Sequence, residues 1–165
     1  MPRAGRIEPT TGQESVWDYP RPPSLQASER HIVLVLGGVE IVDTRRSWRV
    51  CETSHPPTYY LDPADFEPGT LSAGAGSSHC EFKGAATYWD LTAGGVRRDS
   101  AGWSYEDPAT AFVPMRGAIA VYPGRMDGAW VDGEPVTAQA GGFYGGWITP
   151  DVVGPFKGEP NTWSW

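Results

Sequence analysis

Short runs of β-branched and other apolar residues, separated by glycine and proline, dominate the pattern of hydrophobic and polar positions along the chain. The clearest are 31–36 (HIVLVL) and 39–43 (VEIVD), which are joined by Gly37-Gly38. A Gly-Gly pair accepts the positive φ angles of a tight primed turn, so the pattern predicts a β-hairpin. The run 47–52 (SWRVCE) predicts a third strand directly after it.

Further strands are predicted at 79–90, 117–122 and 129–136, and the last of these contains the hairpin signal Asp132-Gly133. Composition points the same way. The 21 glycines and 16 prolines disfavour long helices, while the eight tryptophans, seven tyrosines and five phenylalanines favour pleated surfaces. We therefore expect a mostly β protein with a few short helical turns.

The segments between these runs are expected to be loops or single turns. Residues 61–66 (LDPADF) predict a short helical turn, because Asp62 suits the N-cap and Pro63 the first helical position. The Gly-, Ala- and Ser-rich run 69–78 is expected to be a flexible loop. The tail from 141 onward combines glycines with aromatic residues and should wrap the sheet as loops.

The chain of 165 residues fits one domain. Residues 1–13 are polar and contain two prolines, so we expect a flexible N-terminal arm followed by a single β domain at 14–165. A weak internal repeat also occurs: Trp-x-Tyr begins at Trp17 and again at Trp103, and arginines follow both at the same separation. This pattern indicates either two related antiparallel sheets that lean together or a chance similarity.

The net charge of −7 makes nucleic acid a poor partner, because phosphate binding needs clustered Lys and Arg. The arginines at 45, 46 and 49 are expected on solvated loops or strand faces. No apolar run is long enough to cross a bilayer and the first residues lack an apolar signal segment, so we expect a cytoplasmic protein. Cys51 and Cys80 could pair, but two cysteines are too few to predict a disulfide framework.

Six motifs resemble, in order, those of a known family: ESVWDYPRPP, ETSHPPTYYL, CEFKGAATYWD, GWSYEDP, IAVYPGRMDGAWVDGEPV and GGFYGGWITPDVVGPFKG. They run from about Glu14 to about Gly158 and are similar to the domain-of-unknown-function 427 family, which is largely bacterial with fungal members. The resemblance implies a β-tent, in which two antiparallel sheets lean together with room for a pocket between them. It implies little about chemistry.

Some members of that family are labelled as nucleotidyltransferases, but this chain has no phosphate-cradling glycine loop with a Walker-type lysine and no Asp-x-Asp pair. The Cys-x-x-Cys zinc knuckles of some β-tent relatives are absent too. The chain also departs from the family pattern at Cys51, where an aliphatic residue is usual, at Phe82, where Trp is usual, and in its NTWSW ending. Cys51 is therefore a poor candidate for a shared nucleophile.

The stretch 51–61 (CETSHPPTYYL) gathers the strongest candidates for chemistry. An imidazole such as His55 beside a carboxylate such as Glu52 can act as a general acid or base near neutral pH. The phenols of Tyr59 and Tyr60 could orient a carbonyl or hydroxyl group. The alternative is structural, with His55 bonding to backbone carbonyls and fixing the Pro-Pro turn, and the sequence favours neither.

Two other groups complete the candidate site. Lys83 could serve as a base, a Schiff-base amine or an anchor for an anion if buried, or it could simply pair with a carboxylate at the rim. In the glycine-rich run 141–149, Phe143, Tyr144 and Trp147 could form flat walls for a ligand or could pack the tail on the sheet.

A zinc site made of the two cysteines with His55 and His79 would have an unusual ligand spacing, so we expect no metal. No cofactor motif is present either. We therefore expect a cofactor-independent acid/base enzyme, such as a lyase that dehydrates a small or medium-sized organic metabolite, acting as a monomer or homodimer. The alternatives are a small-ligand-binding module without catalysis and a protein-interaction scaffold. Neither nucleic acid nor a membrane is an expected partner.

Overall fold

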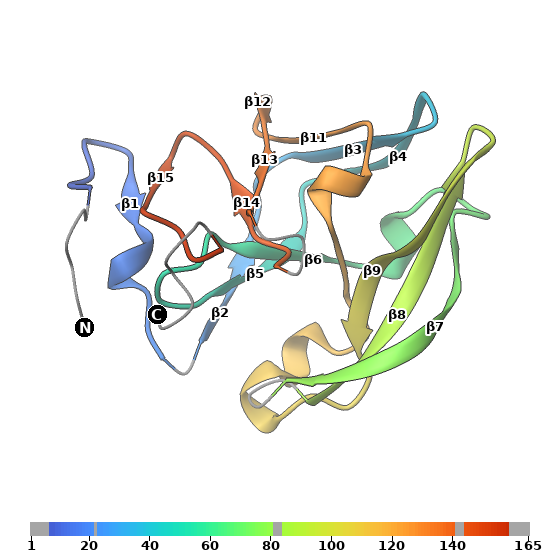
Figure 1. The fold of residues 1–165 in the computed structure, drawn as a ribbon, viewed down its shortest axis with the longest axis horizontal. Helices are drawn as coiled ribbons and strands as arrows, with labels where there is room; N and C mark the ends of the chain where they lie inside the picture. The colour runs from blue at the N-terminus through green and yellow to red at the C-terminus, as the bar shows by residue number, and fades with distance from the viewer. Residues whose placement is uncertain (1–6, 22, 81–83, 141–143, 159–165) are drawn as a thin grey trace.

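The computed structural model describes residues 7–21, 23–80, 84–140 and 144–158, which are mostly β (Figure 1). Two large antiparallel sheets and two pairs of short strands make up the fold. Short 3-10 helices, η1 (Val16–Asp18), η2 (Pro63–Asp65), η3 (Thr110–Met115) and η4 (Pro123–Arg125), connect them. The turn predicted at LDPADF is confirmed as η2, where the Asp62 side chain accepts from the backbone N–H of Ala64.

The larger sheet has seven strands in the order β2-β5-β6-β10-β9-β8-β7. These are β2 (Ser24–Ser28), β5 (Ser47–Cys51), β6 (Thr58–Leu61), β10 (Ile119–Val121), β9 (Val96–Tyr105), β8 (Gly84–Ala93) and β7 (Leu71–Cys80). The short strand β10 bridges two limbs, and Figure 1 shows that the β7–β8–β9 limb crosses the direction of β5 and β6 at a wide angle. The sheet is therefore bent between its two limbs.

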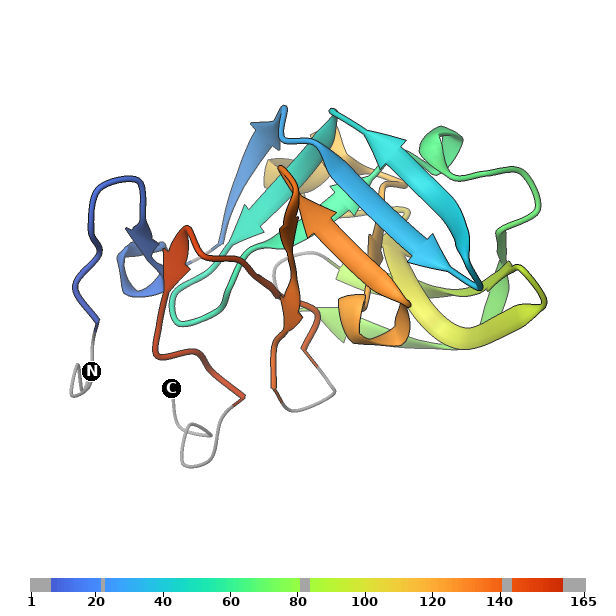
Figure 2. The ribbon, with the colours of Figure 1, turned by 90° about the horizontal axis from the view of Figure 1, so that it is seen from above.

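The smaller sheet has the order β12-β11-β3-β4 and faces the viewer in Figure 2. Its strands are β3 (Ile32–Leu36), β4 (Val39–Thr44), β11 (Gly128–Val131) and β12 (Glu134–Pro135), so both predicted hairpins are confirmed. At the first turn, Gly37 has a φ of 60°, and a Cβ there would lie 2.1 Å from the carbonyl oxygen of Ala93. Glycine is required because this turn packs directly on the β8–β9 turn (Figure 1).

Both ends of the described chain are tied to the body of the protein. Strand β1 (Glu14–Ser15) pairs in parallel with β15 (Val152–Val153), and β13 (Thr137–Ala138) pairs with β14 (Trp147–Ile148). Part of the expected N-terminal arm joins this arrangement, because the backbone N–H of Ile7 donates to the Gly154 carbonyl at 3.1 Å. No helix in the described ranges is long and apolar enough to cross a membrane.

The main hydrophobic core fills the space between the two large sheets. Alternate residues of β3 point into it, and the facing strands of the larger sheet contribute Tyr59, Leu61 and Ile119 among others. A second cluster covers the opposite face of the larger sheet and contains Tyr60 and Trp103. The period of two along β6 thus sends the adjacent Tyr59 and Tyr60 to opposite faces.

Two predictions about the middle of the chain were wrong. The run 69–78, expected to be a loop, forms most of β7, and the strand expected at 79–90 is divided because β7 ends at Cys80 and β8 begins at Gly84. Strand β7 lies at the edge of the sheet and pairs with β8 along its length, with a bulge between Ala73 and Ser77. Backbone hydrogen bonds need no large side chains, so a Gly-, Ala- and Ser-rich segment can form a strand where a partner is provided.

The weak internal repeat is a chance similarity. Trp17 lies in η1 within a third cluster beside Cys51, whereas Trp103 lies in the middle of β9. The strands that follow also differ, because β3 pairs with its neighbour β4 while β10 pairs with β6 and β9.

Candidate functional site

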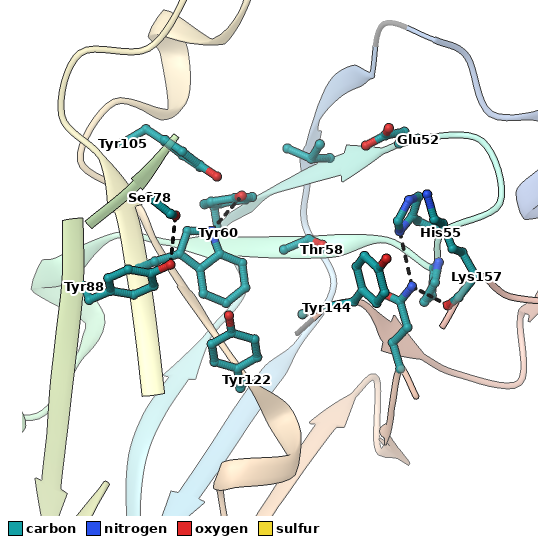
Figure 3. Close-up of a pocket in the computed structure, with 15 residues that line it drawn as sticks. Glu52, His55, Thr58, Tyr60, Ser78, Tyr88, Tyr105, Tyr122, Tyr144 and Lys157 are labelled. Carbon is teal, nitrogen blue, oxygen red and sulfur yellow. Dashed lines mark hydrogen bonds between the residues drawn. The ribbon is translucent and has the colours of Figure 1, made fainter. Parts of the chain in front are cut away.

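A cavity of about 340 Å³ lies on one face of the bent seven-stranded sheet, where side chains from both limbs meet (Figure 3). The resemblance to β-tent proteins implied a pocket between two sheets, but here that space is filled by the main core. Six aromatic side chains line the cavity: Tyr60, Tyr88, Trp103, Tyr105, Tyr122 and Tyr144. Its titratable lining groups other than the phenols are Glu52, His55 and Lys157. A cavity of this size and character suits a small organic molecule.

The aromatic wall is held by contacts among its own members. The indole N–H of Trp103 donates to the Tyr60 hydroxyl at 3.3 Å, and the two rings meet edge to face. On its other side the Trp103 ring lies 4.6 Å from the ring of Tyr122, measured between centroids. The Tyr88 hydroxyl donates to Ser78 at 2.8 Å, which joins the edge strand β7 to the wall. The wall is therefore largely pre-formed.

The corner that carries His55 is a tightly bonded turn. After β5, Ser54 has a φ of 70°, and the backbone N–H of His55 donates to the carbonyl of Glu52 at 3.0 Å. Ser54 also accepts from the backbone N–H of Lys157 and donates its own N–H to Val16. The backbone of this stretch is thus a structural junction between η1 and the C-terminal tail, while the imidazole lines the cavity.

The buried side chain of Gln139 sets the orientation of that imidazole. Its amide oxygen accepts from the Gly146 N–H at 3.2 Å, so its nitrogen is the donor that reaches the Lys157 carbonyl at 2.7 Å. The same nitrogen lies 3.2 Å from Nδ1 of His55 and has a second hydrogen to give. Nδ1 must therefore accept, and a neutral His55 carries its proton on Nε2. Tyr144 packs edge-on against the ring at 5.4 Å.

The structure brings only part of the predicted site together. Glu52, His55, Tyr60 and Tyr144 line the one cavity. Lys83 and Phe143 lie outside the described residues.

Two predicted wall residues belong to the core instead. Tyr59 and Trp147 are fully buried in the main cluster, with ring centroids 5.0 Å apart, and the Trp147 indole donates to the Val121 carbonyl. Neither lines the cavity, because the alternation along β6 turns Tyr59 away from it and β14 carries Trp147 into the interior.

Sequence reasoning missed Gln139, Lys157 and most of the aromatic wall. Lys157 is one cation in the tail, and Gln139 stands between two alanines, so neither carries a local signal. Tyr88 and Trp103 lie within strands and Tyr122 directly follows one, but a strand pattern does not say which face bears a cavity.

Gly145 and Gly146, the described glycines of the run 141–149, allow close packing. A Cβ on Gly145 would lie 2.1 Å from the Trp103 ring, and one on Gly146 would lie 2.5 Å from the Gln139 amide oxygen. The bare backbone of Gly145 therefore packs on a ring and also lines the cavity.

A second polar cluster lies on the far side of β5. Arg49, expected to be solvated, is buried and bonds to Glu14 at 2.5 Å and to Gln26 at 2.9 Å. Tyr19 donates to the same carboxylate at 2.6 Å. This correction has a plain cause: the parallel pairing of β1 brings an acid over the sheet, so the strand can bury a guanidinium that is paired.

Cys51 is a free, buried thiol in the third cluster. Burial raises its pKa to about 11, which keeps it protonated and unreactive near neutral pH. Within the described ranges, no three His, Cys, Asp or Glu side chains gather where they could hold a metal ion.

Together, the bent sheet and its aromatic cavity define a small, mostly β protein built of several antiparallel sheets. A family model described as a domain of unknown function, DUF427, matches residues 24–132, and the chain therefore belongs to that family. The family resemblance of the motifs is thus confirmed. No curated protein matches the chain.

Proposed function

We propose that the protein binds a small organic metabolite in the aromatic cavity and performs cofactor-independent acid/base chemistry on it, as a lyase that eliminates water. The observation that carries this proposal is the fixed imidazole of His55, which shares one small cavity with the carboxylate of Glu52 and with several phenols. Dehydration beside a carbonyl group needs only placed proton acceptors and donors.

The roles follow from the hydrogen bonds. Glu52 accepts the α-proton of a β-hydroxy carbonyl compound, because Nδ1 of His55 is engaged by Gln139. The Nε2–H of His55 donates to the oxygen on which enolate charge develops, as a neutral imidazole can. Lys157 or a lining phenol gives a proton to the departing hydroxyl group, so water leaves and a carbon–carbon double bond forms.

A binding module without catalysis is the second candidate, and the composition of the cavity favours it. Aromatic side chains outnumber the other titratable groups there, and the His55 corner also holds the backbone together. A scaffold that displays aromatic residues is less well supported. The large apolar side chains with high exposure in the described chain are Ile7, Val39 and Val113, which lie in the N-terminal segment, in β4 and in η3.

One experiment separates these functions. The parent protein and its Glu52→Gln and His55→Gln variants are incubated with a panel of β-hydroxy acids, amides and ketones, and the conjugated product is followed by its ultraviolet absorbance. We expect turnover in the parent and a loss of about 10²–10⁴-fold in each variant. Saturable binding of a compound in calorimetry without formation of product would support the binding module over the lyase. Equal turnover by all three proteins would refute the assigned roles.

A further inference from the structure

A second cavity, of about 490 Å³, adjoins the first. The two share four lining residues, Tyr88, Tyr122, Gln139 and Tyr144, so they meet along this line of side chains. Beyond it the second cavity is bounded by small residues and by Arg125 of η4. An extended ligand could therefore lie with its body among the rings of the first cavity and its end in the second.

Arg125 is an exposed arginine at the wall of this second cavity, and like Arg21, Arg45 and Arg98 it forms no ion pair with a carboxylate among the described residues. Arg30, Arg46, Arg49, Arg97 and Arg116 all form ion pairs with carboxylates. Within the described chain, by contrast, no carboxylate lies within ion-pair distance of the Arg125 guanidinium, although the protein carries a net charge of −7. An unpaired cation at the wall of a cavity in an acidic protein is suited to an anionic ligand group.

The hydroxyl group of Tyr122 lies beside this charge. Burial raises the pKa of Tyr122, as does the neighbouring phenol of Tyr88, and the positive charge of Arg125 opposes that rise. The phenol of Tyr122 therefore stays protonated, and it lies close enough to Arg125 for the two groups to interact electrostatically. One guanidinium with a neutral phenol matches a single negative charge, which a carboxylate carries, better than the double charge of a phosphate.

His55 borders the same junction, because it contacts both Gln139 and Tyr144. We infer that the ligand is a flat organic acid whose apolar body lies against Trp103 and Tyr60 and whose carboxylate binds Arg125 across the junction. This inference rests on the proposed function only for the place of reaction: the carbon atoms next to the carboxylate would then lie at the junction, which His55 borders.

The test uses three probes with one flat body and different head groups: trans-cinnamate, trans-cinnamamide and cinnamyltrimethylammonium. Their affinities for the full chain are measured by calorimetry at fixed ionic strength. A hydrogen bond to a charged group contributes more than a neutral one, so we expect cinnamate to bind about fivefold or more tightly than the amide, and the ammonium to bind weakest.

Variants assign the preference to its residue. Arg125→Gln should bring cinnamate and the amide within about twofold of each other without weakening the amide, and Arg125→Lys should keep part of the preference. Arg45→Gln is the matched control, because Arg45 is an exposed arginine that lines neither cavity. It removes the same charge and should change nothing. Thermal unfolding of each variant verifies that it is folded.

The inference is overturned if the parent binds the amide or the ammonium as tightly as cinnamate, if Arg125→Gln keeps the preference, or if none of the probes binds saturably. The proposed function is tested separately, because it is refuted by turnover of the His55 and Glu52 variants at the rate of the parent. An Arg125-dependent preference for the acid in a protein without turnover would support the inference and leave a binding module.

Discussion

The hydrogen bonds of Gln139 make the sharpest prediction, because they fix both the stability of the cavity wall and the position of a proton. Two substitutions separate these effects. Gln139→Ala removes every side-chain bond at once. Gln139→Glu keeps an acceptor for the Gly146 N–H but replaces the donor that faces His55 with an acceptor.

The expected loss of stability follows from the partners left behind. Gln139→Ala leaves three groups without the amide: the N–H of buried Gly146, the half-buried Lys157 carbonyl and Nδ1 of His55. A buried group without a partner costs about 1–3 kcal/mol, and the two groups nearer the cavity can turn to water, so we expect a total of about 2–4 kcal/mol. For a domain of this size that lowers the thermal midpoint by about 4–16 °C.

The position of the proton on the His55 ring can be determined by nuclear magnetic resonance. Long-range ¹H–¹⁵N correlations distinguish the two neutral tautomers of a histidine ring without any ligand. In the parent we expect His55 to carry its proton on Nε2. In Gln139→Glu the new carboxylate should draw a proton to Nδ1, while His31, which bonds to Asp43 on another part of the surface, provides an internal control that should not change.

Two results would refute this reasoning. A parent His55 with its proton on Nδ1 would mean that the amide does not donate to the ring. A midpoint for Gln139→Ala within about 1 °C of the parent would mean that its three partners are satisfied without it.

Three further predictions concern other parts of the structure. Gly145→Ala places a Cβ 2.1 Å from the Trp103 ring, so the ring must move, and we expect at least about tenfold weaker binding of any ligand that calorimetry detects. Burial raises the pKa of Asp151, but its hydrogen bonds with Thr149 and Arg30 lower it by more, so the pKa lies below its ordinary value. The contribution of this carboxylate to stability is therefore present above the ordinary aspartate pKa of about 4 and is lost as the pH falls below it. The free energy of unfolding, measured with urea at several pH values, should fall less below about pH 4 in Asp151→Asn than in the parent, and an equal fall in both proteins would contradict this. Because the pKa of Cys51 is raised from 9.0 to about 11, the stability contributed by its protonated thiol is complete below pH 9.0 and is lost as the pH rises towards 11. The free energy of unfolding of Cys51→Ala should therefore fall less than that of the parent over that interval.

The sequence predicted best where the signal is local. Both hairpins formed as expected, because Gly-Gly and Asp-Gly pairs accept backbone angles that few other residues adopt. The turn at Asp62 formed for a similar reason, since the cap and its partner are two residues apart. The edge strand β7 was missed because its small side chains carry no apolar alternation and its only cue is the partner β8.

The candidate site shows where local reasoning ends. His55, Glu52 and Tyr144 could be chosen by residue type, and the structure brings them to one cavity. Tyr59 could not be separated from Tyr60, because alternation says only that adjacent residues face opposite ways and the identity of the inner face depends on how the sheets pack.

By itself, the sequence determined the class of fold, the turns and the supply of rings and titratable groups. Tertiary structure alone decided that β10 enters between β6 and β9 and bends the sheet, that Gln139 meets an imidazole far away in the chain, and that Arg49 is buried against Glu14. The physical reason is that turns depend on dihedral angles of adjacent residues. Strand order, cavities and buried polar pairs depend on contacts between distant segments, which no local pattern specifies.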